Sequence, residues 1–154
     1  IPLQLLESFQ REQDFLQNTE SYSQIKMALL DQLLHSDVVL TNKFDSTTLY
    51  HGLEHKLKVL ADVESNWQGK FGHLFGYGAS YYSYLLDRAI ASKVWKHLFA
   101  ENPLDRANGE KFKNAVLKWG GSRNPWLCVS DALDQPLVAK GDSEAMALIG
   151  ETEL

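Results

Sequence analysis

Apolar residues recur at helical spacing over most of the chain. Leu49, Leu53, Leu57 and Leu60 show the pattern clearly, because steps of three or four residues return to the same side of an α-helix. Glycines, prolines and polar clusters interrupt this periodicity and mark the expected helix ends. The pattern predicts helices at about residues 2–17, 22–35, 48–66, 79–100, 104–119, 125–133 and 143–149.

One interval, "SDVVLTNKFDS" at residues 36–46, has some strand character. Its apolar residues 38–40 favour β-structure, but three such residues between polar turn formers are a weak strand signal. We therefore expect a connector between helices, and the predicted fold class is all-α. The tail after Leu133 is polar and ambiguous apart from its one weak helix.

Composition and charge narrow the function classes. At 154 residues the chain is long enough for one domain with one core, and without a run of about 18 apolar residues no membrane span is expected. The 20 acidic and 15 basic residues are scattered and leave a net charge of −5, so nucleic acid is a poor candidate partner. The single cysteine, Cys128, cannot form an internal disulfide, and its neighbours predict a small apolar residue on a short helix.

The stretch "HGLEH" at residues 51–55 matches an inverted zinc motif, in which two histidines bind the metal and the glutamate acts as general base. At 100° per residue the histidines lie about 200° and 240° around the helix from Leu49, away from the leucine stripe. We therefore expect His51 and His55 to face solvent. A zinc site built on this motif is the alternative.

A glycine-rich loop, at about residues 69–78, leads into an aromatic-rich helix and contains His73. On one continuous helix, Tyr77, Tyr81 and Tyr84 would lie within about 40° of Tyr77 and would form a row of hydroxyls. Phenol or imidazolium donors aimed at developing negative charge stabilise tetrahedral intermediates. The stretch therefore indicates an accessory site for acyl transfer.

Two features of this loop leave its interpretation open. Gly72 and Gly76 allow unusual backbone angles and the close approach of a ligand, which favours a binding loop. Tyrosines at helical spacing are also typical of an aromatic core stripe, with hydroxyls at the edge of the core. Pattern alone favours the core stripe.

Two long stretches of the chain resemble a known enzyme family. They read "FGHLFGYGASYYSYLLDRAIASKVW" and "NPLDRANGEKFKNAVLKWGGSRNPW", and they closely resemble the C-terminal catalytic region of the thimet oligopeptidase family of zinc metallopeptidases, particularly its fungal mitochondrial members. The match runs at least from Phe71 to Leu133, with weaker similarity over residues 1–70. It implies that residues 1–154 are one C-terminal segment of a larger, mainly helical zincin-type catalytic domain.

The resemblance also implies roles for particular residues. In the family, the histidine of F-G-H and the tyrosines after it contact substrate and stabilise the tetrahedral intermediate. By position, the resemblance implies oxyanion-stabilising, catalytic roles for His73 and Tyr84. It implies substrate-binding roles for the other loop residues, namely Tyr77, Tyr81, Gly72 and Gly76.

The mitochondrial members of the family imply a parent enzyme of the mitochondrial matrix. Such an enzyme removes an octapeptide from imported precursor proteins after a first processing cut. The expected partner is therefore a peptide or precursor protein, with no nucleic-acid or membrane partner, and the parent enzyme is expected to be monomeric.

The chain departs from the family pattern in one important respect. The family binds one zinc ion through an HExxH motif and a further glutamate, and the sequence contains no HExxH. Because zinc lowers the pKa of its bound water and polarises the scissile carbonyl, the segment alone is expected to be inactive. The zinc is expected to be bound by residues outside this chain. A start at Ile1 without a targeting signal is consistent with a fragment or a processed product.

A non-catalytic helical module that presents an aromatic groove to a partner peptide is the competing hypothesis. An HExxH motif about a hundred residues before His73 would favour the peptidase, whereas an unrelated upstream domain would favour the binding module.

Overall fold

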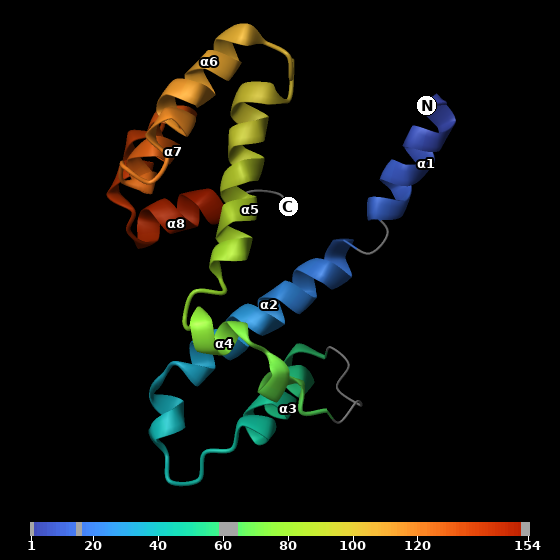
Figure 1. Cartoon of the computed structure of the whole chain (residues 1–154), viewed down its shortest axis with the longest axis vertical. Coiled ribbons are helices and arrows are strands. Elements are labelled where there is room, and N and C mark those ends of the chain that lie inside the picture. The colour runs from blue at the N-terminus through green and yellow to red at the C-terminus, as the bar shows by residue number, and fades with distance from the viewer. Residues whose placement is uncertain (1, 15–16, 59–64, 152–154) are drawn as a thin grey trace. The chain divides into compact units, whose positions relative to one another are not determined.

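The computed structural model describes residues 2–14, 17–58 and 65–151, and every regular element within these ranges is helical (Figure 1). The α-helices are α1 (Leu3–Asp14), α2 (Gln17–Leu34), α3 (Ser46–Leu57), α4 (His73–Gly76), α5 (Ser83–Val94), α6 (Arg106–Ala115), α7 (Pro125–Leu133) and α8 (Ser143–Gly150). Shorter 3₁₀ segments lie at Asp37–Leu40, Trp67–Lys70, Leu117–Trp119 and Pro136–Lys140, and a π-helical turn lies at Trp95–Phe99. The all-α prediction is confirmed. None of the helices in the described ranges is both long and apolar enough to cross a bilayer.

The chain divides into two compact units, residues 1–85 and residues 86–154. In the first unit, Leu30 of α2 packs with Tyr50 and Leu53 of α3 to form a small buried cluster. The second unit has a larger buried cluster, made of Ala89, Val94, Leu98, Ala115, Val129, Ala132, Leu133, Val138 and Ile149. Chain length predicted one core, whereas the described residues form a separate core in each unit.

Residues 134–151 of the tail are a packed part of the second unit. Val138 and Ile149, of the Pro136–Lys140 segment and α8, are fully buried. Gly141 joins these two elements with φ 62°, and a Cβ there would overlap the ring of Trp126, so only glycine fits. The weak helix predicted at residues 143–149 is confirmed as α8, and the packed tail resolves the ambiguity of the sequence pattern.

Several helix boundaries differ from the predictions. The helix expected at residues 48–66 ends at Leu57, because Lys58 adopts a left-handed conformation with φ 56° and closes the last turn. Leu60, which the pattern placed in this helix, lies outside the described residues. α2 begins at Gln17, five residues before its predicted start.

Asp45 caps the N-terminus of α3. Its carboxylate accepts hydrogen bonds from the backbone N–H groups of Thr47 (3.4 Å) and Thr48 (2.9 Å). The hydrogen bond from the Thr48 hydroxyl has the largest effect on the carboxylate. Together with the bonds from these N–H groups, it holds the pKa of Asp45 below its ordinary value of 3.8. Asp45 therefore caps α3 in its ionised form.

This cap predicts an acid-dependent loss of stability. A lowered folded-state pKa contributes stability that is present above about pH 3.8 and lost as the pH falls through the folded-state value. Asn also caps helices but does not titrate, so Asp45→Asn is the matched variant. In thermal unfolding of the 154-residue chain, the stability difference between wild type and Asp45→Asn is expected to shrink below about pH 3.8. A difference independent of pH would contradict this role of the charge.

Candidate functional site

The predicted site residues lie on the short helix α4, on the turn that follows it and on the start of α5, all within the first unit. His73 begins α4, Tyr77 is the C-cap of α4, and Tyr84 lies in the first turn of α5. The helix predicted from residue 79 begins only at Ser83, so Tyr77 and Tyr81 precede it. The single helical face proposed from the sequence is therefore wrong, although the side chains do converge.

His73 is the centre of an aromatic cluster formed by these side chains. Its ring centroid lies 5.9 Å from that of Tyr77, 5.5 Å from that of Tyr81 and 6.2 Å from that of Tyr84. The rings of Tyr81 and Tyr84 are 5.0 Å apart. The Tyr84 hydroxyl lies 3.5 Å from His73 Nε2, at the long limit of a hydrogen bond. We call these four residues the His73 cluster.

Exposure separates the three tyrosines of the cluster. Tyr77 is 69% exposed and Tyr84 is 49% exposed, whereas Tyr81 is only 9% exposed. The Tyr81 hydroxyl donates a hydrogen bond of 2.9 Å to Gln24 Oε1 of α2 and lies 3.4 Å from Met27 Sδ. Tyr81 thus packs on the buried side of the cluster, and Tyr77 and Tyr84 are the tyrosines accessible to a peptide.

Three further aromatic residues extend the cluster into the body of the first unit. The Phe71 ring lies 5.2 Å from His73 and 5.1 Å from Tyr81, and it stacks on Trp67 at 4.7 Å. Trp67 in turn lies 6.2 Å from buried Tyr50. Trp67 and Phe71 were not among the predicted site residues, although their four-residue spacing is a usable signal.

The glycines of the loop act differently from the prediction. Gly72 has an ordinary helical conformation with φ −59°, and a Cβ on Gly72 or Gly76 would meet no atom within 4 Å. The unusual backbone angle belongs instead to Ala79, with φ 59°. Gly78 is the one loop glycine fixed by a close approach, because a Cβ there would overlap the His35 ring. Open space at Gly72 and Gly76 remains consistent with a peptide lying across the loop.

The "HGLEH" stretch lies on α3, and two of its three candidate ligands are occupied by other contacts. His55 is exposed as predicted, but His51 is half-buried and its Nε2 lies 2.9 Å from the carbonyl oxygen of Ser65. Glu54, the base that the motif requires, is buried and paired with Lys26 at 2.9 Å. Nowhere in the described ranges do three His, Cys, Asp or Glu side chains come close enough to hold a metal ion.

The Lys26–Glu54 pair lies beside a pocket of about 400 Å³ in the first unit. Burial alone would lower the pKa of Lys26, but hydrogen bonds to Glu54 at 2.9 Å and to the Tyr50 hydroxyl at 3.2 Å outweigh burial and raise it. Lys26 is therefore charged at neutral pH, and its ammonium group forms an ion pair with the Glu54 carboxylate.

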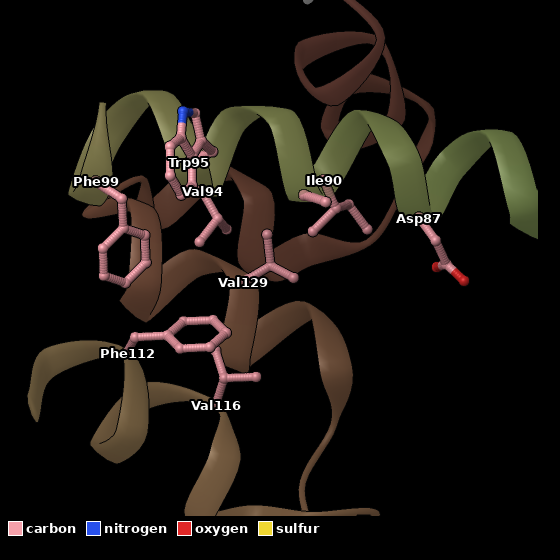
Figure 2. Close-up of a pocket in the computed structure, with 9 residues that line it drawn as sticks. Asp87, Ile90, Val94, Trp95, Phe99, Phe112, Val116 and Val129 are labelled. Carbon is pink, nitrogen blue, oxygen red and sulfur yellow. The ribbon is translucent and has the colours of Figure 1, made fainter. Parts of the chain in front are cut away.

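The second unit contains an apolar pocket of about 340 Å³ between α5, the π-helical turn, α6 and α7. Figure 2 shows the rings of Phe99 and Phe112 at one end of this pocket and Asp87 at the other. The remaining lining side chains are Ile90, Ala91, Val94, Trp95, Val116 and Val129. One carboxylate among apolar side chains offers less chemistry than the imidazole and phenols of the His73 cluster, which is therefore the candidate site.

Comparison with known proteins places the chain in a family. The profile of Peptidase family M3 matches residues 1–148. The chain belongs to peptidase family M3. This M3 chain is 60% identical over 153 residues to "Mitochondrial intermediate peptidase" of Eremothecium gossypii. The aligned region covers 99% of the chain and 19% of the relative.

Other fungal relatives of the M3 chain bear the same name. It is 57% identical over 154 residues to the Candida glabrata protein and 51% identical over 154 residues to that of Saccharomyces cerevisiae S288c, covering 99% of the chain and 20% of the relative in both cases. The chain thus spans about a fifth of the length of the curated relatives it matches. No solved structure matches the M3 chain significantly.

Proposed function

We propose that the chain is the C-terminal part of the catalytic domain of a zinc metalloendopeptidase, in which it supplies substrate-binding and oxyanion-stabilising residues. The observation that carries the proposal is the His73 cluster in an M3 chain, with the half-exposed Tyr84 hydroxyl 3.5 Å from His73 Nε2. Two donors side by side at an accessible surface suit the developing charge of a tetrahedral intermediate.

The proposed division of roles follows exposure. His73 and Tyr84 donate hydrogen bonds to the oxyanion, and Tyr77, the most exposed of the three tyrosines, contacts the peptide backbone. Tyr81 shapes the substrate side of the cluster through its ring, since its hydroxyl is bound to Gln24. The open space at Gly72 and Gly76 leaves room for the bound peptide.

The described residues do not fit the zinc ion that the family resemblance implies. In the "HGLEH" motif His51 is bonded to a backbone carbonyl and Glu54 is paired with Lys26, which leaves only the exposed His55, too few ligands for zinc. In this proposal the zinc is bound by residues outside the chain, and the roles above concern this chain's own side chains alone.

The proposed substrate is an imported mitochondrial precursor protein that has already been cut once. The complete enzyme would remove an octapeptide from its new N-terminus in the mitochondrial matrix. The names of three fungal relatives, all "Mitochondrial intermediate peptidase", support a mitochondrial peptidase, and the octapeptide and the matrix are what the family resemblance implies.

A cleavage assay tests the proposal. The complete protein, with the residues outside this chain, is expected to contain one zinc ion per molecule by elemental analysis. It is expected to release an eight-residue peptide, identified by mass spectrometry, from a synthetic precursor that starts at the first cleavage site. The 154-residue chain alone is expected to bind such peptides without cleaving them. If the complete, zinc-loaded protein binds the precursor but leaves it intact, the chain belongs to a peptide-binding module.

A further inference from the structure

Asp31 of α2 is a buried carboxylate that contacts the loop of the candidate site. It is only 1% exposed. Its Oδ1 accepts a hydrogen bond of 2.9 Å from the backbone N–H of Ala79, and its Oδ2 accepts one of 2.9 Å from the N–H of Tyr81. Charge-assisted bonds of this kind are stronger than neutral ones, so both carboxylate oxygens fix the backbone between Tyr77 and Tyr84.

Two neighbours of Asp31 hold the same turn. Gln32 Nε2 donates a hydrogen bond of 3.0 Å to the carbonyl oxygen of Ala79. His35 Nδ1 lies 3.0 Å from Asp31 Oδ1, and the His35 ring lies so close to Gly78 that a Cβ there would overlap it. We call Asp31 and Gln32 of α2, together with His35 directly after the helix, the α2 clamp.

The turn held by the clamp has a conformation that its own sequence disfavours. Ala79 has φ 59°, and left-handed backbone is costly for alanine because its Cβ approaches the following carbonyl oxygen. Both the N–H and the carbonyl oxygen of Ala79 are bonded to α2 side chains. The clamp therefore stabilises a backbone that would otherwise relax, and relaxation would move the attached tyrosines.

We propose that Asp31 is a positioning residue for the reaction, which acts through the turn at residues 78–81 to hold Tyr84 against His73. This inference rests on the proposed function. Tyr81 connects the two regions, because its N–H is bonded to Asp31 while its ring lies 5.0 Å from Tyr84 and 5.5 Å from His73. A displacement of about 1 Å in a catalytic donor can lower a rate about 100-fold, so small movements of the turn are sufficient.

The test compares two variants of the complete, zinc-loaded enzyme. In Asp31→Asn an NH2 group, which cannot accept a hydrogen bond, replaces one of the two oxygens that bind the N–H groups of Ala79 and Tyr81. We therefore expect kcat to fall about tenfold or more, with KM changed less than about twofold. Leu53→Ala removes buried packing between α2 and α3 but no hydrogen bond to the turn at residues 78–81. It is expected to lower the unfolding temperature while kcat, measured well below that temperature, changes less than about twofold.

A milder variant keeps the test decisive if Asp31→Asn folds poorly. Gln32 is exposed, so Gln32→Ala removes one clamp bond without affecting the buried carboxylate, and kcat is expected to fall about twofold to fivefold. In either clamp variant, hydrogen exchange of peptides covering residues 78–81 is expected to accelerate relative to wild type and to Leu53→Ala.

A double variant separates positioning from general destabilisation. If Asp31 acts through Tyr84, the loss of kcat in Asp31→Asn/Tyr84→Phe is smaller than the product of the two single losses. Multiplicative losses, or normal kcat in Asp31→Asn beside a large loss in Tyr84→Phe, would overturn the positioning role and leave the proposed function standing. Normal kcat in both Tyr84→Phe and His73→Ala would instead overturn the proposed function.

Discussion

Replacing Tyr84 by phenylalanine in the complete enzyme is expected to lower kcat about 100-fold or more. The change removes only the hydroxyl that lies 3.5 Å from His73 Nε2, and the loss of one oxyanion donor corresponds to about 2.7 kcal/mol of transition-state stabilisation. Because the oxyanion forms only in the transition state, KM is expected to change little. Steady-state kinetics on the precut precursor peptide measure both constants.

The chain contains a close control for this change. Tyr82 is 42% exposed, similar to Tyr84 at 49%, but the rings in contact with His73 do not include it. Tyr82→Phe is therefore expected to retain wild-type kcat. Unchanged turnover in Tyr84→Phe together with a lower unfolding temperature would show that the Tyr84 hydroxyl serves packing instead.

Removing Glu54 is expected to destabilise the first unit strongly. In Glu54→Ala the ammonium of Lys26 loses its partner at 2.9 Å while its side chain, 9% exposed, stays largely buried. An uncompensated buried charge of this kind costs about 3 kcal/mol or more. Urea denaturation of the 154-residue chain, compared with wild type, measures the difference.

The paired replacement Lys26→Met/Glu54→Leu distinguishes a buried charge from lost packing. It removes both charges and keeps apolar volume, so the chain is expected to recover most of the stability lost in Glu54→Ala. If Glu54→Ala costs less than about 1 kcal/mol, as exposed pairs do, the pair contributes little to the fold.

Helix content and several boundaries could be predicted from local sequence. α7 begins at Pro125 and ends at Leu133 as predicted, because a proline suits a first helical position. Asn124 caps this helix, and its side-chain oxygen accepts a hydrogen bond from the N–H of Trp126. The end of α3 could not be predicted in this way. Its leucine periodicity continues to Leu60, but Lys58 adopts a left-handed angle that periodicity does not encode.

The sequence predicted which side chains would come together around the loop but not the geometry that brings them together. Helical spacing selected Tyr77, Tyr81 and Tyr84, yet these residues converge on His73 because a turn, and not a helix, leads into α5. Hydrogen bonds between α2 and residues 79–81 shape that turn across separations of 47, 48 and 50 residues. Contacts so distant along the chain leave no periodic signal in a single sequence.

The α2 clamp also restricts which sequences the loop can accept. Gly78 and Ala79 are both exposed, and exposed positions usually accept many substitutions. Here the His35 ring excludes any side chain at position 78, and the left-handed angle at position 79 disfavours β-branched and bulky residues. In a deep mutational scan, these two surface positions would tolerate as few replacements as the buried positions of the core.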